Sequence, residues 1–218
     1  MKDTISIVLS VLALGLSSVT AWLTLLRTGT IRMTRPTVVF FGPDGGSGPN
    51  GESRPKVFLR TLLFSTSQRG RIVESMYITL RRGETRQTFS IWVYGDKQLM
   101  RGSGLHVGHT GVVCNHHFLL PDDGTGYRFL LGSYTVEVYA SLVGEKKPRQ
   151  LSKFVLVVSE AVGGQLQAPD AGVYFDWGPD SNTYHPHVEV RSEPPIPPML
   201  VAFPHGLATE RLAKGKTV

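Results

Sequence analysis

An uncharged apolar run close to the N-terminus constrains this chain more than any other feature. Ile5–Leu26 is a stretch of 22 consecutive residues without an acidic or basic side chain. As a helix it is about 33 Å long, which matches a hydrocarbon core of about 30 Å. Trp22 lies near its end, where aromatic rings favour the membrane interface, and Arg27 follows it directly. The run therefore predicts a single transmembrane helix over residues 5–26.

A cleaved signal peptide is the alternative interpretation of the same run. Lys2 places a positive charge before it, and Val19–Ala21 fits a small-residue pattern with cleavage after Ala21. However, the run is longer than the apolar part of an ordinary signal peptide, and it continues through Trp22–Leu26. The length favours a retained anchor.

Positive charge is unevenly placed on the two sides of this run. Arg27, Arg32 and Arg35 follow it closely, whereas Lys2 and the α-amine precede it beside Asp3. Because Lys and Arg stay preferentially in the cytoplasm, we expect a single-pass protein with a cytoplasmic head. The alternative places the head on the outer or periplasmic side.

Small side chains form one stripe along the predicted helix. They recur at alternating spacings of four and three residues, and such a stripe lets two membrane helices approach closely. We expect it to support self-association or pairing with another membrane protein. Its members are Ser6, Ser10, Ala13, Ser17, Thr20 and Thr24.

The rest of the 218-residue chain has the composition of a folded, basic domain. Hydrophobic residues make up 41% and charged residues 18%, and the 24 glycines and 14 prolines favour turns over long helices. Residues 27–159 carry eighteen Lys and Arg against nine Asp and Glu, whereas residues 160–218 carry four against seven. A lone cysteine, Cys114, excludes an intramolecular disulfide and favours a reducing compartment.

Alternating and β-branched runs predict seven strands after the anchor. They follow one another at hairpin spacing, without a helix-period segment of useful length, which indicates an antiparallel β-sandwich or a barrel. The strands are expected at Thr37–Phe41, Lys56–Thr66, Arg71–Arg81, Thr85–Tyr94, Gly111–Leu120, Ser133–Val143 and Gln150–Ser159.

One segment favours the sandwich. In Tyr127–Ala140 a glycine turn at Gly132 precedes Tyr134 and an alternating apolar strand. This segment resembles the penultimate strand of immunoglobulin-like and fibronectin-like domains, and the hairpin that follows, to about residue 159, resembles their closing hairpin. The resemblance implies a mainly β fold, an antiparallel immunoglobulin-like β-sandwich head behind a single transmembrane helix. The Cys…Trp…Cys signature of immunoglobulin domains is absent, and such a fold hosts unrelated functions.

An aromatic, turn-rich extension is expected after the sandwich, with Tyr174–Trp177 covering a sheet edge or core and His187–Val190 adding a short strand. Beyond it, Arg191–Pro198 is proline-rich and matches a form that SH3-type grooves bind, although a spacer or a lid against the head is the simpler interpretation. The chain thus divides into an N-terminal tail (1–4), the transmembrane helix (5–26), a basic juxtamembrane segment (27–35), the β-sandwich (36–160), the extension (161–190) and a proline-rich tail (191–218).

Histidines gather around the cysteine, which suggests a zinc or copper site. The candidate ligands are His106, His109, Cys114 and His116. Strand alternation places Cys114 and His116 on one face and His117 on the other. No spacing matches a closed four-ligand pattern, so ordinary packing is the simpler interpretation. A metal-binding protein or metalloenzyme is our alternative function.

Other motifs do not support catalysis. Gly102–Gly104 lacks the spacing of a serine-hydrolase elbow, and Asp122–Asp123 lies in a segment typical of a tight turn. Gly215–Thr217 resembles the end of a phosphate loop, but Glu210 stands where its first glycine belongs.

Arginines cluster around two turns and predict a basic rim that serves as a solvated edge or contacts anionic headgroups, rather than binding nucleic acid. They are Arg69, Arg71, Arg81, Arg82 and Arg86. The sequence therefore predicts a membrane-tethered binding or assembly module that is not an enzyme and needs no cofactor. We expect its partners to be the membrane and a second copy or another membrane protein, not a nucleic acid or a small-molecule substrate.

Overall fold

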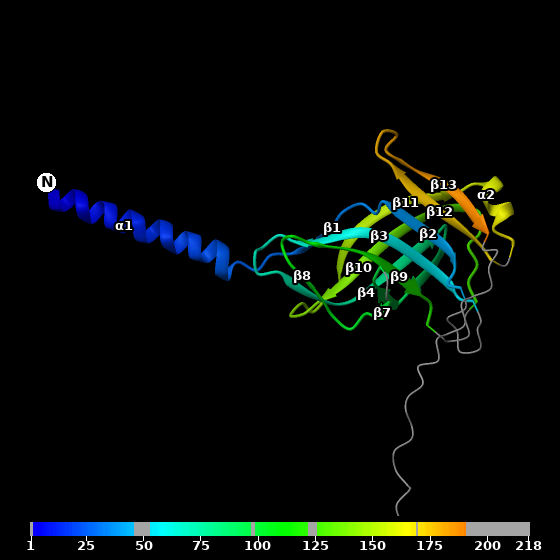
Figure 1. Cartoon of the computed structure of the whole chain (residues 1–218), viewed down its shortest axis with the longest axis horizontal. Helices are drawn as coiled ribbons and strands as arrows, with labels where there is room; N and C mark the ends of the chain where they lie inside the picture. The colour runs from blue at the N-terminus through cyan, green and yellow to red at the C-terminus, as the bar shows by residue number, and fades with distance from the viewer. Residues whose placement is uncertain (1, 46–52, 97–98, 122–125, 169, 191–218) are drawn as a thin grey trace, which may run out of the picture.

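The head consists of two antiparallel sheets behind a single N-terminal helix (Figure 1). Strands make up 52% of the described residues, which confirms the prediction of a mainly β fold. The computed structural model describes residues 2–45, 53–96, 99–121, 126–168 and 170–190.

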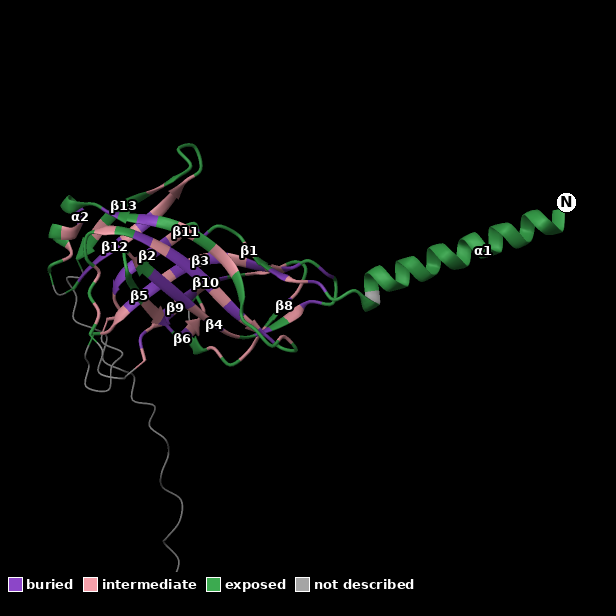
Figure 2. Cartoon of the chain, turned by 180° about the vertical axis from the view of Figure 1, so that it is seen from behind, coloured by how far each residue is buried: buried purple, intermediate pink, exposed green. Residues whose placement is uncertain are grey.

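Helix α1 (Lys2–Ala21) projects from one end of the head, and the π-helical turn η1 (Trp22–Leu26) continues it. It begins at Lys2 rather than at Ile5, and Asp3 in the first turn interacts favourably with the positive end of the helix dipole. None of the residues of α1 is buried (Figure 2). In length and composition Lys2–Thr24 fits a membrane span, and it equally fits a signal sequence. The predicted sidedness stays a prediction.

The larger sheet has eight strands in the order β13-β12-β2-β3-β9-β6-β7, with β1 also paired to β3. Leu63 of β3 pairs with Val112 of β9 on one side and with Met33 of β1 on the other. β1 therefore lies along the same edge of β3 as β2. The strands are β1 (Ile31–Met33), β2 (Val38–Pro43), β3 (Pro55–Ser65), β6 (Ile91–Tyr94), β7 (Met100–Arg101), β9 (Val112–Leu119), β12 (Ala171–Gly178) and β13 (Thr183–Val190).

The smaller sheet has the order β11-β10-β4-β5, and β8 pairs with the first residues of β4. Register shifts in β10 at Val138–Tyr139 and Ser141–Leu142 mark local irregularities in the ladder. The strands are β4 (Arg71–Arg82), β5 (Thr85–Phe89), β8 (Leu105–Val107), β10 (Gly132–Leu142) and β11 (Arg149–Val158). A short helix, α2 (Glu160–Gln165), follows β11.

Six of the predicted strands correspond to β2, β3, β4, β9, β10 and β11, but the predicted strand Thr85–Tyr94 is two strands. β5 pairs with β4 in the smaller sheet, and β6 pairs with β9 in the larger one. Phe89 and Trp92 are both buried, and three positions separate them, so a single alternating strand cannot point both inward. The chain changes sheets at Ser90 for this reason.

One hydrophobic core lies between the sheets, and buried residues line their inner faces (Figure 2). Phe41 of β2 is central to it. Its ring lies 4.9 Å from that of Phe129, 5.5 Å from that of Tyr134 and 5.4 Å from that of Phe175. The core thus joins strands of both sheets to the segment before β10.

A tyrosine fixes the entry of the chain into β10. The hydroxyl of Tyr134 donates to the carbonyl of Leu130 at 2.7 Å and accepts from its amide at 2.8 Å. Gly132 lies between them with φ +133°, a conformation that favours glycine. These contacts occur in the segment that carries the predicted resemblance.

The predicted juxtamembrane segment 27–35 belongs in part to the head. β1 lies within it, and the amide of Thr66 donates to the carbonyl of Thr30 at 2.9 Å. Gly29 packs so closely on Ser67 that a Cβ would overlap it. Only Arg27 and Thr28 therefore lie between η1 and the first residue held by the head.

The predicted extension 161–190 contains most of α2 and a hairpin, β12 and β13, that covers the edge of β2 in the larger sheet. β12 pairs with β2 on one side and with β13 on the other, and β13 is longer than the predicted strand His187–Val190. Phe175 is buried in the core, whereas Trp177 packs under the guanidinium of Arg35 at 4.0 Å. The aromatic segment thus holds the hairpin in place.

Several predictions fall wholly or partly outside the described residues. Pro43 pairs with Pro55 across the glycine-rich segment, whose central residues 46–52 are not described. The aspartates at 122–123 and the tail 191–218, with its SH3-type and phosphate-loop motifs, also lie outside them.

Candidate functional site

Cys114 and His116 do converge on the buried face of β9, as strand alternation predicts. Sγ of Cys114 lies 3.3 Å from Nε2 of His116. The other ring nitrogen, Nδ1, accepts a hydrogen bond from the indole Nε1 of Trp92 at 3.1 Å. Both nitrogens of His116 therefore have partners within the core.

Burial controls the protonation of this pair. It lowers the pKa of His116 to about 4, with a smaller contribution from His117, and it raises the pKa of Cys114 to about 11. At neutral pH the imidazole is neutral and the thiol is protonated. Because the thiolate is the nucleophile and the metal ligand, this environment favours packing over reactivity.

The remaining metal candidates do not join the pair. His106 lies in β8, which pairs with β4 in the smaller sheet, and His109 lies in the following loop. Both are exposed, whereas Cys114 and His116 are buried. Among the described residues, no group of three or more His, Cys, Asp or Glu side chains is placed to hold a metal ion.

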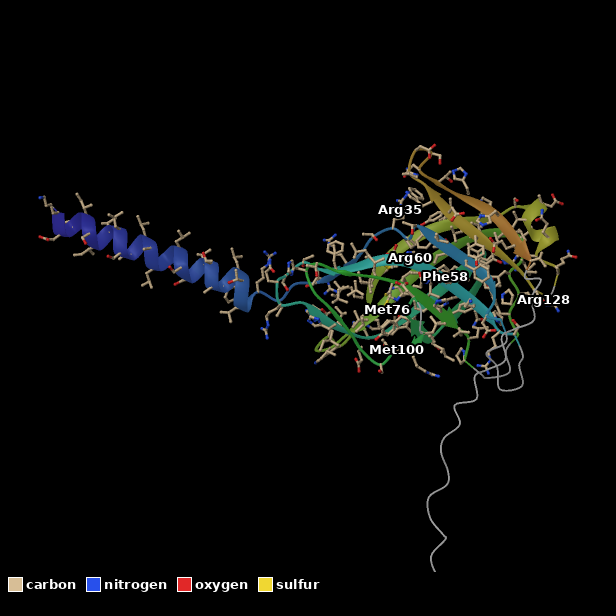
Figure 3. The ribbon with its side chains drawn as sticks, viewed as in Figure 1. Arg35, Phe58, Arg60, Met76, Met100 and Arg128 are labelled. Atoms are coloured by element: carbon tan, nitrogen blue, oxygen red, sulfur yellow. The ribbon has the colours of Figure 1, made fainter. Side chains whose placement is uncertain are left out.

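The five predicted basic residues do not form one surface. Arg69 lies in the turn before β4 and Arg71 begins that strand, whereas Arg81 and Arg82 end it. Twelve residues of strand span roughly 37 Å, and Arg86 lies at the far end with Arg81. That far end also carries Arg128 (Figure 3). The head therefore has two separate basic ends.

A network of charges ties the segment after the N-terminal helix to the head. Arg71 donates to the carbonyl of Gly29 at 3.0 Å and pairs with Glu145 at 3.1 Å. Arg149 pairs with the same carboxylate at 3.2 Å and also donates to the Thr30 hydroxyl. Glu145 thus lies between two arginines that both reach the segment entering β1.

A second network occupies the outer face of the smaller sheet. Glu137 is only 5% exposed, and its carboxylate pairs with Lys153 at 3.2 Å and Arg81 at 3.5 Å and accepts from the Tyr139 hydroxyl. Burial raises the pKa of Glu137, but the Lys153 hydrogen bond and the Arg81 charge outweigh it and hold the pKa below its usual range. The Tyr139 ring stacks on Tyr77 at 5.0 Å.

Aromatic rings cross the outer face of the larger sheet in one row. The register aligns His187, Tyr174, Phe40, Phe58 and His117 on five neighbouring strands. Phe40 lies 4.6 Å from Tyr174, and Phe58 lies 4.9 Å from His117. Nδ1 of His117 is buried without a hydrogen-bond partner in the described structure, and burial lowers the pKa of this ring to about 4.

The hydroxyls of the small-residue stripe bond to their own helix. Ser10 donates to the carbonyl of Ser6 at 2.9 Å, and Thr20 and Thr24 donate to carbonyls four residues earlier at 2.8 Å. At these three positions the donor is engaged within the helix, so close packing is the contact that they offer to a second helix. The association of the stripe stays a prediction.

No protein-family model matches the chain, and searches of curated proteins and of solved structures also find no match. The site residues missed from the sequence are Trp92, Glu137 and Glu145. The sequence did offer a signal for Glu137. It is the one carboxylate of its strand and lies between Val136 and Val138, so alternation places it on the outer face.

Proposed function

We propose that this protein is a membrane-tethered, immunoglobulin-like β-sandwich that binds a second copy or another membrane protein and has no catalytic activity of its own. The observation that carries the proposal is the strand order of the two sheets together with the two-residue connection to an apolar helix.

Strand order supports the immunoglobulin-like part of the proposal. In that fold the strands run A-B-E-D in one sheet and G-F-C, extended by C′, in the other. β2-β3-β9-β6 corresponds to the first order and β11-β10-β4-β5 to the second. The hydroxyl of Tyr134 bonds to Leu130 near the start of β10, the position of the tyrosine corner in this fold. β12 and β13 extend the first sheet beyond β2.

The Cys114–His116 pair supports a non-catalytic head. A protonated, buried thiol and a neutral imidazole held by Trp92 are poorly suited to nucleophilic or metal chemistry. Metal analysis of the purified full chain tests this point. Stoichiometric zinc or copper that disappears in Cys114→Ala would favour a metalloprotein instead.

The outer edge of β11 is the proposed partner surface. Within the described residues β11 pairs on one side only, with β10. Val155 and Val157 lie beside this edge and are 53% and 58% exposed. An edge strand that pairs on one side within the described part of the chain and has apolar neighbours is suited to strand addition or to packing against another chain.

Site-specific photo-crosslinking in native membranes tests the module. A photoreactive residue replaces Val155 in the full chain, and the matched control carries it at Arg86, an exposed position of β5. We expect a crosslinked dimer or heteromer from position 155 and little from position 86. Equal yields from the two positions would contradict the proposal, and Ser10→Leu, Ala13→Leu and Ser17→Leu together should weaken the crosslink if the helix stripe contributes.

We further propose a cytoplasmic head, supported by Arg27, Arg32 and Arg35 on the C-terminal side of the helix. Fusions of the full chain to reporters that are active on one side of the membrane test this. Activity of a C-terminal reporter that requires export would contradict it.

A further inference from the structure

The connection between helix and head is too short to let them separate. Leu26 ends η1, and Gly29 is already held by Arg71 and packed on Ser67. Three Cα–Cα steps span at most about 11 Å. If the helix crosses a bilayer, this end of the head lies at the bilayer surface.

Three connections of the head meet at this end, the side to which α1 is joined (Figure 1). The β3–β4 turn is tied to the loop after β8, because Ser65 donates to the carbonyl of Gly108 at 3.0 Å. The β10–β11 turn is tied to β4, because Val143 donates to the carbonyl of Ile72 at 3.1 Å. These connections form one continuous surface, which we call the anchor-proximal end.

The charge of the anchor-proximal end is strongly positive. Residues 27–32, 66–74, 105–110 and 143–149 together hold seven Lys and Arg against two Glu, a net charge of +5. Glu145 is shared by Arg71 and Arg149. Arg69, Lys146 and Lys147 are exposed, and no ion pair joins them to an acidic residue within the described part of the chain. These three cations point to an anionic partner.

Two apolar side chains accompany the cations. Ile72 of β4 is 45% exposed, and Val143, the residue after β10, is 53% exposed. Their neighbours Val73 and Leu142 are paired and buried, so Ile72 and Val143 both point to the outer face of the smaller sheet. Exposed aliphatic groups beside Lys and Arg are the chemistry of surfaces that enter the headgroup region of a membrane.

We propose that the anchor-proximal end docks on the bilayer that holds the helix, with Arg69, Lys146 and Lys147 on anionic headgroups and Ile72 and Val143 at the interface. This rests on the proposed tethered module and deepens it, because docking fixes how the β11 edge is presented. A protein partner has no comparable support, since the short connection places lipid next to this end in every copy.

Fluorescence quenching in nanodiscs tests the docking with the full chain. Val143→Cys carries an environment-sensitive dye. The unsubstituted chain, whose Cys114 is buried and protonated, is treated in the same way to measure background labelling. The nanodiscs contain phosphatidylcholine alone or mixed with phosphatidylglycerol, and a nitroxide on the headgroups quenches a dye that touches the surface. We expect stronger quenching in the anionic mixture, weakened by high salt. A dye at Gln87→Cys should stay unquenched.

Charge reversal supplies the matched control. Each cation near an anionic surface contributes about a fivefold factor to the docking equilibrium constant, so removing three positive charges lowers it on the order of 100-fold. Arg69→Glu, Lys146→Glu and Lys147→Glu together reverse those charges and should lower it by at least that factor. Arg86→Glu, Arg101→Glu and Arg128→Glu make the same charge change elsewhere and should leave quenching unchanged. A dye at Ile72→Cys repeats the test if Val143→Cys does not fold.

The outcomes separate docking from the tethered module. If the protein stays in the nanodisc but its quenching is the same in both lipid mixtures and in the charge-reversed variant, the docking alone is overturned. The same dye is also measured in native membranes. A fluorescence change that occurs there but not in nanodiscs of pure lipid would assign the surface to a protein partner and would also overturn the docking. A chain that does not remain in the nanodisc overturns both proposals.

Discussion

Trp92 donates its indole N–H to Nδ1 of His116 across 3.1 Å, between neighbouring strands of the larger sheet. Because Nδ1 accepts, the neutral ring carries its proton on Nε2, which faces Cys114 at 3.3 Å. Protonation of Nδ1 would remove this acceptor and place a charge in the core. The protonation of His116 is therefore coupled to folding.

Acidification should destabilise the head through His116. Its pKa falls from 6.5 when unfolded to about 4 when folded, because burial disfavours the charged ring. Between these values the unfolded chain binds a proton that the folded chain does not. The stabilising contribution is complete above the unfolded pKa and is lost as the pH falls toward the folded one, on the order of 3 kcal/mol. Thermal unfolding of the detergent-solubilised full chain measures it.

The control for this pH dependence is His116→Gln, which retains an acceptor for Trp92 but does not titrate. It should flatten the decline in unfolding temperature on acidification. Burial also lowers the pKa of His117 to about 4, so acidification should destabilise the head through this residue as well. His117→Gln is therefore measured separately. An identical slope in His116→Gln and the unsubstituted chain would show that the coupling is absent.

Strand alternation predicts the faces of β9 correctly, because a strand with one buried side repeats every two residues. It could not predict Trp92 as the partner of His116, since that contact depends on the change of sheet at Ser90. The pairing of β8 with β4 likewise separates His106 from Cys114, although they are close in sequence. Long-range register, which no local pattern encodes, decides both.

The basic residues illustrate the same limit. Arg71 and Arg81 lie ten positions apart, next to two different turns, and the sequence predicted that they share one basic surface. β4 is a single strand between those turns, so it holds the two residues at opposite ends. The end that contains Arg71 lies next to the N-terminal helix because β1 pairs with β3. The three residues of β1 are too few to predict that pairing from the sequence.

Tyr134→Phe should destabilise the head. The substitution removes the hydroxyl that satisfies both the amide and the carbonyl of Leu130, while the ring stays in the core. Leaving partly buried backbone groups without partners costs about 1–3 kcal/mol. Urea unfolding of the full chain measures the change, and Tyr77→Phe, on the outer face, should cost less than about 0.5 kcal/mol. Equal losses in the two variants would contradict a special role for Tyr134.

Gly172→Ala should destabilise the hairpin of β12 and β13. A Cβ at Gly172 would overlap the ring of Phe40, which is itself 5% exposed. Overpacking of this kind costs about 1–3 kcal/mol. Gly164→Ala in α2 is the control, because nothing lies near its added Cβ.

A double-mutant cycle identifies the overlap as the cause. Phe40→Leu removes the ring, so Gly172→Ala should cost measurably less in that background than in the unsubstituted chain. Costs that simply add would mean that the strain at Gly172 arises elsewhere.

Arg71→Met should loosen the connection between the N-terminal helix and the head without unfolding the core. The guanidinium of Arg71 bonds to the Gly29 carbonyl, and its loss removes one charged hydrogen bond that holds the chain entering β1. Such bonds contribute about 1.5–3 kcal/mol, so hydrogen exchange at the amides of Thr30 and Thr66 should accelerate by roughly tenfold or more. Amides of β10 should exchange at an unchanged rate. Arg69→Met removes an exposed neighbouring cation and should leave both Thr amides protected; acceleration in that variant as well would point to general electrostatics rather than to the Gly29 contact.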